Sequence, residues 1–217
     1  MMVSSECAAG ILATRKYGGK RLKETSNAYL MQFLLSLEGV SQEQANLMAH
    51  HLQVSEFKKG ERLIAQGEPA HKCYFILKGM VRKYAVNEEG IETTFDFLSE
   101  YDTAIVSYQE NLAQISPYSF ECLEQCIAIV GELNQVEADF DAIPEFRDIS
   151  RQIMEANLDK VHTTLATYIR MSLEERVQHI IDTRPDLLTR VPQHQLASYL
   201  GMKPESLSRI KRRLSKK

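Results

Sequence analysis

A regular series of glycine turns between short strand-forming segments most restricts what this chain can fold into. The turns lie at 59–61, 66–69, 78–79 and 87–90, at intervals of about seven to twelve residues. Between them, Cys73–Leu77, Val81–Val86 and Ile91–Leu98 are rich in β-branched and aromatic residues. A further pair of strands is expected at about 120–126 and 127–133. This spacing predicts an antiparallel barrel or sandwich.

The segment from Val191 to Leu214 has the pattern of two helices joined by a glycine turn. Gly201 can adopt the positive φ that such a turn requires, and Pro204 suits the first turn of a second helix. Both helices repeat apolar residues at helical spacing, so each has one buried face: Leu196, Ala197 and Leu200 in the first, and Leu207, Ile210 and Leu214 in the second. The pattern predicts a helix-turn-helix, which indicates DNA binding.

The charge is distributed to match that prediction. From Lys203 onward there are seven Lys or Arg residues and one acidic residue, about +6, while the whole chain is −3 and the remainder therefore about −9. A basic tip on an acidic body is typical of a nucleic-acid contact surface, although a solvated basic helix face is the simpler alternative. The predicted DNA-contacting residues are Lys203, Glu205, Ser206, Ser208, Arg209, Lys211, Arg212 and Arg213.

A long helix is expected from Glu145 to about Met171. Its apolar residues recur at alternating spacings of four and three: Met154, Leu158, Val161, Leu165 and Tyr168. A helix that faces its own core would show the same stripe, but the length favours a helix that pairs with a second copy. We therefore expect a homodimer, which would present two DNA-reading helices to a two-fold symmetric site.

Several other classes of protein find little support in the sequence. No apolar run approaches the ~20 residues that a membrane span needs, and the first residues do not resemble an ordinary signal peptide, so a cytoplasmic protein is expected. There is no nucleophile–base set and no phosphate-binding glycine loop, so we expect no enzyme. The cysteines Cys7, Cys73, Cys122 and Cys126 lack metal-ligand spacing and are interpreted as small buried hydrophobic residues; no metal, iron–sulfur or haem signature is present.

The order of these parts resembles the Crp/Fnr superfamily of bacterial transcription regulators. The resemblance rests on 57–84, FKKGERLIAQGEPAHKCYFILKGMVRKY, and on 173–214 with its ASYLGMKPESLSRIKRRL segment. It implies an α+β fold: an antiparallel β-roll of jelly-roll type with flanking helices, a dimerisation helix and a helix-turn-helix domain. The implied divisions are a flexible arm (1–28), a cyclic-nucleotide-binding-like sensor (29–144), a dimerisation helix (145–171) and the DNA-binding domain (172–217). The implied partners are double-stranded DNA, a second copy, a small effector and RNA polymerase.

The recognition helix fits this family with one departure. Glu205 and Arg209 fall where the family places residues that contact base edges, and their chemistry suits cytosine N4 and guanine O6/N7. Pro204 occupies the position of a further base-contacting Arg, so one donor is missing.

The effector segment departs further. Ile105-Val106 replaces the Gly-Glu pair that binds the ribose of a cyclic nucleotide, and Tyr118 replaces the Arg that pairs with its phosphate. No Lys or Arg lies between Lys83 and Arg147, and a buried phosphate without a cation is costly. Binding of cyclic AMP in the family's way is therefore not expected. The predicted pocket residues are Ile105, Val106, Tyr108, Tyr118 and Ser119, for an unknown ligand or none. A ligand-binding or protein-interaction module without DNA specificity is the alternative function.

Overall fold

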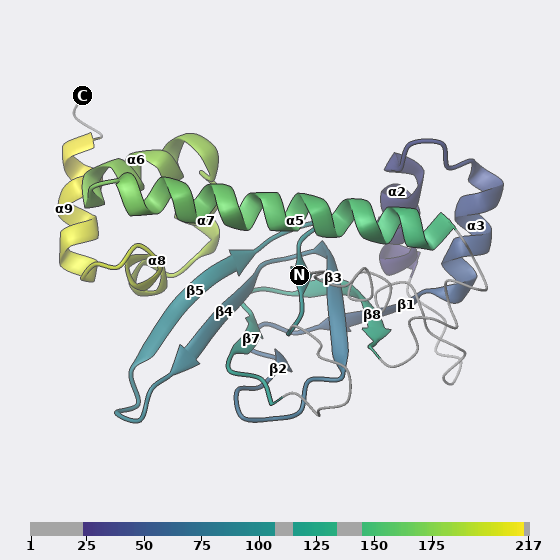
Figure 1. The fold of residues 1–217 in the computed structure, drawn as a ribbon, viewed down its shortest axis with the longest axis horizontal. Coiled ribbons are helices and arrows are strands. Elements are labelled where there is room, and N and C mark those ends of the chain that lie inside the picture. The colour runs from purple at the N-terminus through teal and green to yellow at the C-terminus, as the bar shows by residue number, and fades with distance from the viewer. Residues whose placement is uncertain (1–23, 107–114, 134–144, 215–217) are drawn as a thin grey trace.

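The computed structural model describes residues 24–106, 115–133 and 145–214. Within these residues, two short helices, α2 (Glu24–Ser36) and α3 (Gln42–His51), precede eight strands, and five helices follow. In Figure 1 the long helix α5 (Glu145–Arg170) crosses above the sheets, from α2 and α3 at one end to the C-terminal helices at the other. Those C-terminal helices are α6 (Leu173–Thr183), α7 (Leu187–Arg190), α8 (Gln193–Tyr199) and α9 (Pro204–Leu214).

The strands form two four-stranded antiparallel sheets, ordered β1-β8-β3-β6 and β2-β7-β4-β5. The strand bounds are β1 Gln53–Phe57, β2 Arg62–Ile64, β3 Lys72–Lys78, β4 Val81–Val86, β5 Glu92–Leu98, β6 Thr103–Ala104, β7 Ser119–Cys122 and β8 Cys126–Glu132. This arrangement confirms the predicted β-roll and its α+β class. The last two strands were expected at about 120–126 and 127–133. In the structure the turn between them follows Cys122, not Cys126, so these two cysteines lie on different strands.

Alternation along β3 separates two hydrophobic cores. Tyr74 and Ile76 face the interior of the roll, where both sheets meet. Cys73, Phe75 and Leu77 face the other way and pack under α2 and α3. We call the first of these cores the roll interior. It contains Leu63, Ile64, Ala70, Tyr74, Ile76, Val81, Leu98, Ala104, Val106, Phe120, Cys122, Cys126, Ala128 and Val130.

Helix α2 begins earlier than the sequence suggested. The predicted arm extended to residue 28, but residues 24–28 belong to α2, while 1–23 lie outside the described residues. Ser26 explains the difference, because it is buried and its hydroxyl donates to Glu56 Oε1 at 2.6 Å, which fixes the start of α2 to β1. A capping box at Ser41 begins α3: Gln44 N donates to Ser41 Oγ, and Ser41 N donates to Gln44 Oε1.

The three cysteines that the structure describes, Cys73, Cys122 and Cys126, are free thiols and buried, as the sequence indicated. A hydrogen bond with Cys126, together with burial, raises the pKa of the Cys122 thiol, which keeps it protonated. Cys7 lies outside the described residues. Among the residues described, no helix is long and apolar enough to cross a membrane.

Candidate nucleic-acid interface and ligand pocket

The turn between α8 and α9 is a Schellman motif, which fixes the angle between the two helices. Gly201 has φ +71°, and its amide donates to Ser198 O at 3.1 Å, while the Met202 amide donates to Ala197 O at 3.0 Å. Pro204 is the first residue of α9, and the Ser206 and Leu207 amides close the first turn on Lys203 O. Residues 193–214 therefore form two helices joined by a tight glycine turn.

One face of α9 is buried as expected. Leu207 is fully buried, and Ile210 and Leu214 pack against the same cluster, which joins α6, α7 and α8 to the outside of the roll. The buried residues of this cluster are Met80, Phe97, Leu123, Val177, Ile180, Leu187, Val191, Leu196, Ala197, Leu200 and Leu207. Because the apolar face is fixed in this way, the polar residues of α9 must point outward.

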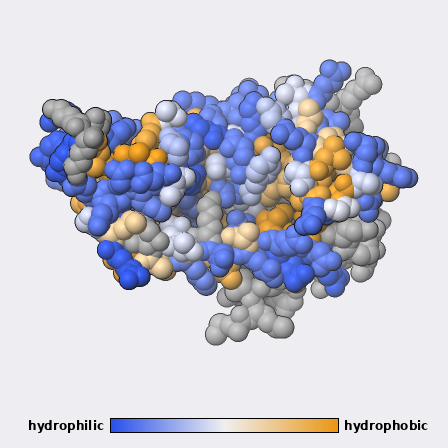
Figure 2. All heavy atoms as spheres, turned by 90° about the horizontal axis from the view of Figure 1, so that it is seen from above, coloured by the Kyte–Doolittle hydropathy of each residue, from blue (hydrophilic) through white to orange (hydrophobic). Residues whose placement is uncertain are grey.

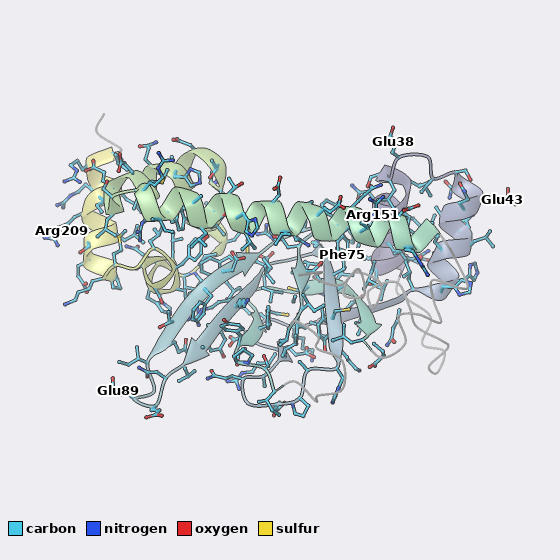
Figure 3. The ribbon with its side chains drawn as sticks, viewed as in Figure 1. Glu38, Glu43, Phe75, Glu89, Arg151 and Arg209 are labelled. Carbon is cyan, nitrogen blue, oxygen red and sulfur yellow. The ribbon has the colours of Figure 1, made fainter. Side chains whose placement is uncertain are left out.

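The outward face of α9 presents side chains of the kind that contact DNA. Lys203, Glu205 and Arg209 are exposed, and within the described ranges none of them has an ion pair. Figure 3 shows Arg209 on the outer side of α9, at the opposite end of the molecule from Glu38 and Glu43. Arg212 is also exposed, while Ser206 and Lys211 are half-buried.

Two of the predicted DNA-contacting residues, Ser208 and Arg213, also make contacts within the chain. The Ser208 hydroxyl is hydrogen-bonded to Gln193 Nε2 of α8, and Arg213 forms a two-point ion pair with Glu174 of α6. Arg176, also on α6, donates to Leu200 O in the turn at 3.3 Å and to Tyr168 O of α5 at 3.0 Å. These contacts position α9 against its neighbours. The sequence did not indicate Gln193, Glu174 or Arg176, because their partners depend on the tertiary fold.

A second set of contacts joins the C-terminal helices to the roll; we call it the junction. The Thr94 amide of β5 donates to Ser198 Oγ of α8 at 3.0 Å. The Phe97 ring lies edge-on to Tyr199, with centroids 5.4 Å apart. Arg184 donates to Phe97 O at 3.0 Å. The strand β5 therefore contacts α8 through both backbone and side chains. Figure 1 shows the two elements next to each other.

Arg190 is the ionic centre of the junction. Its guanidinium pairs with Glu100 at 2.8 Å and with Glu124 at 2.5 Å, and all three side chains are partly shielded from solvent. The Gly79 amide also donates to Glu100, at 2.9 Å. Burial opposes ionisation of Glu100, but the hydrogen bonds from Arg190 and Gly79 outweigh it, so the pKa of Glu100 is lowered. The same two carboxylates raise the pKa of Arg190.

The predicted dimerisation stripe is exposed over most of its length. Leu158, Val161 and Leu165 lie on the solvent side of α5, with Leu165 59% exposed. Tyr168, the last residue of the predicted stripe, packs its ring edge-on against His179 and Tyr199 within the same chain. Ile169, 74% exposed, lies beside it on the open side of the helix. The side chain of Met154 is outside the described residues. From above, hydrophobic patches are interrupted by hydrophilic side chains (Figure 2).

The predicted pocket residues do not all line one space. Val106 is in the roll interior and Tyr118 packs against it. Ile105 packs instead against the core under α2 and α3. Ser119 lies on the face of β7 opposite Phe120, where its hydroxyl accepts from the Gln66 amide at 3.0 Å, because neighbouring strand residues point to opposite faces. Tyr108 lies outside the described residues.

The structure adds to this region one residue that the sequence prediction missed. Lys83 of β4 lies opposite Phe120 of β7, and its ammonium is 4.2 Å from the centroid of the Tyr118 ring. Lys83 immediately precedes the segment, 84–146, that contains no Lys or Arg. An available signal was strand alternation, because Lys83 follows Val81 by two residues and Val81 is an interior residue.

Residues 54–138, which include most of the roll, match the model of the family described as "Cyclic nucleotide-binding domain". Among curated proteins, no sequence matches this chain. Solved structures with a similar fold include FixK2 from Bradyrhizobium japonicum, which is 16% identical, covers 76% of this chain and 85% of its own, and has a TM-score of 0.61.

Two further structures are similar. The c-di-GMP responsive global regulator CLP from Xanthomonas campestris is 14% identical, covers 76% of this chain and 87% of its own, and has a TM-score of 0.58. A CRP/FNR-family transcriptional regulator from Thermus thermophilus is 19% identical, covers 76% of this chain and 86% of its own, and has a TM-score of 0.57. At these identities the likeness concerns the fold. The chain therefore has a cyclic nucleotide-binding-type roll and the fold of these regulators.

Proposed function

We propose that this protein is a homodimeric, sequence-specific DNA-binding transcription regulator of the Crp/Fnr type. The observation that carries the proposal is α9. Its apolar face is buried around Leu207, while Lys203, Glu205 and Arg209 project into solvent from the opposite side. A helix fixed in this way can enter a major groove with its N-terminal residues toward the base edges. Glu205 and Arg209 are the residues proposed to contact bases, and Lys203, Arg212 and Lys211 the phosphates.

The exposed face of α5 supports the dimeric part of the proposal. Leu158, Val161, Leu165 and Ile169 are apolar and open to solvent along the C-terminal half of a 26-residue helix. At 1.5 Å per residue this helix is about 39 Å long, enough to pair with its copy over several turns. A dimer would present two α9 helices to two half-sites, which explains why a symmetric operator is expected.

The roll is proposed as the sensor of the regulator. Arg190, Arg184 and Ser198 connect β5 and the roll to the helices that hold α9. A change in the roll can therefore be communicated to α9 through the junction. RNA polymerase is the partner that a regulator of this type would contact.

The function is tested by selecting genomic fragments that bind the purified protein and measuring their affinity at several salt concentrations. We expect enrichment of a site with two-fold symmetry, and an affinity that falls steeply with salt because several phosphates are neutralised per dimer. Analytical ultracentrifugation of a Leu165→Asp variant checks the dimer, since a charge at the seam should yield monomers that bind the selected site weakly. Enrichment of no sequence would overturn the proposal in favour of a protein-docking module.

A further inference from the structure

The side chain of Lys83 enters the roll from the second sheet. Val81 and Lys83 are two residues apart on β4 and share a face, and Val81 belongs to the roll interior. Lys83 is directly opposite Phe120, which is 1% exposed and belongs to the same core. The Lys83 ammonium lies 4.2 Å from the Tyr118 ring centroid and 5.7 Å from that of Phe120. The cation is therefore placed at aromatic faces near the core rather than in free solvent.

This cation lacks the counter-charge that its neighbour has. Arg82, the adjacent residue, points to the other face of β4, where it pairs with Glu92 at 2.6 Å and donates to Thr94 Oγ1 at 2.9 Å. Among the described residues, no carboxylate lies within ion-pair distance of Lys83. Burial lowers the pKa of Lys83, and the more distant Asp96 raises it without reversing the shift. A half-buried ammonium that lies beside two aromatic rings, with no carboxylate of the described residues at ion-pair distance, would be stabilised by an added anion.

The backbone is irregular at this same position. Lys83 pairs with Asp96 and Tyr84 pairs with Thr94, so Phe95 is an extra residue in β5. Such a β-bulge changes the direction of a side chain, and bulges are common beside binding sites. Here the Phe95 ring meets Tyr118 edge-on, with centroids 5.0 Å apart, although Phe95 remains 48% exposed. The cation is thus bordered by aromatic rings that solvent can reach.

We propose that Lys83, Tyr118 and Phe95 form a subsite for a small organic anion, with Lys83 pairing the charged group and the two rings contacting a flat, apolar body. This deepens the proposed function, on which it rests, by assigning the sensor a chemical class of effector. Such a ligand has one anionic group next to a planar body, and the anionic group can be a carboxylate or a phosphate ester. The site differs in position from Ile105-Val106, the segment where the resemblance places the ribose contact.

The test uses two matched pairs of probes, with the full chain and no DNA. Benzoate is compared with neutral benzamide, and cyclic AMP with neutral adenosine, by calorimetry and by NMR of the lysine side chains. We expect at least one anion to bind with millimolar or better affinity, about tenfold or more tightly than its neutral partner. The bound anion should also raise the pKa of Lys83, because an opposite charge favours the ammonium form.

Variants separate this subsite from general anion binding. Lys83→Met should weaken the anion that binds by about tenfold or more, whereas Lys83→Arg should keep most of its affinity. Lys72→Met is the matched control, since Lys72 is on β3 in a surface pair with Glu132. If Lys83→Met weakens the binding of benzoate alone, the site binds carboxylates. If it weakens the binding of cyclic AMP, the site binds phosphate esters. Binding that is equal in wild type and Lys83→Met, or no anion binding at about 10 mM, would overturn the subsite. The proposed DNA binding is tested separately, by selection of genomic fragments, so a failure of the DNA-binding proposal can be told apart from a failure of the anion subsite.

Discussion

The basic residues at the junction and those on α9 are used in opposite ways. Arg184 and Arg190 reach back to the roll, where Phe97 O, Glu100 and Glu124 accept their hydrogen bonds. Lys203, just before α9, and Arg209 on α9 are exposed to solvent, and no ion pair involves them among the residues described. A cation whose hydrogen bonds are already made fixes the position of an element. A cation that makes no such hydrogen bonds within the protein can still form favourable ones with a phosphate or a base.

The same contrast exists within α9 itself. Arg213 is held by Glu174, so its guanidinium serves to keep α9 against α6. Arg209, one turn earlier on the helix, has no such partner in the described part of the chain and points away from the molecule (Figure 3). Sequence alone gives the two arginines the same role, and the structure separates them. The following changes test whether that separation holds.

Gly79→Ala should have the largest effect, because it disrupts the roll side of the junction. Gly79 has φ +111°, and a Cβ there would lie 2.5 Å from Cys126 Sγ and 2.9 Å from Gln125 O. Backbone strain and overpacking together should cost about 2–5 kcal/mol of unfolding free energy. Urea denaturation measures this loss. Gly90→Ala is the control, since Gly90 has φ +78° and open space around it, and should cost about 1–2 kcal/mol. Similar losses in both variants would show that the junction tolerates the change.

Arg190→Met should have the next largest effect on stability. It leaves Glu100 and Glu124 partly buried beside each other without their shared cation. Because both carboxylates keep some contact with water, we expect a loss of about 1–3 kcal/mol, between the values for exposed and buried pairs. Arg209→Met should change the unfolding free energy by less than about 0.5 kcal/mol. If the two variants lost equal stability in urea, the distinction between positioning and projecting cations would be wrong.

Arg209→Ala and Arg213→Ala should differ in DNA binding rather than in folding. Loss of Arg209 should reduce discrimination at one base pair by about 1–3 kcal/mol, with little change on random DNA. Loss of Arg213 should lower the affinity for all DNA sequences evenly and by a smaller factor, because it loosens the packing of α9 against α6. Competition binding with the selected site and single-base variants measures both effects. Equal loss of discrimination would place Arg213 at the bases too.

The sequence predicted those features that depend on neighbouring residues. Glycine turns marked the strands, and Gly201 marked the turn before α9. Each of these signals involves residues that are only a few positions apart in the sequence. The heptad spacing likewise located α5, but it could not show that Tyr168, in the last turn of α5, contacts His179 of α6 and Tyr199 of α8.

The remaining features depend on contacts that are remote in sequence. Arg190 and Glu100 are 90 residues apart, and no local pattern pairs them. Lys83 comes next to Tyr118 only through the register of β4 with β7. Ser119 follows Tyr118 in the sequence, but the strand turns its side chain to the opposite face, where it accepts from the Gln66 amide. Register and domain packing, more than residue type, decided which candidate residues share a site.

The smallest expected effect is an acid dependence of the junction. Hydrogen bonds from Arg190 and Gly79 hold the pKa of Glu100 below its ordinary value of 4.5 despite burial. A lowered pKa in the folded state contributes stability above the unfolded-state value, and this contribution is lost as pH falls through the folded value. Urea denaturation of the wild type and Arg190→Met between about pH 7 and pH 3 should therefore show curves that converge below about pH 4.5. Parallel curves over the whole range would mean that Arg190 acts by packing alone. No such convergence is expected for Arg209→Met, because the described structure pairs Arg209 with no carboxylate.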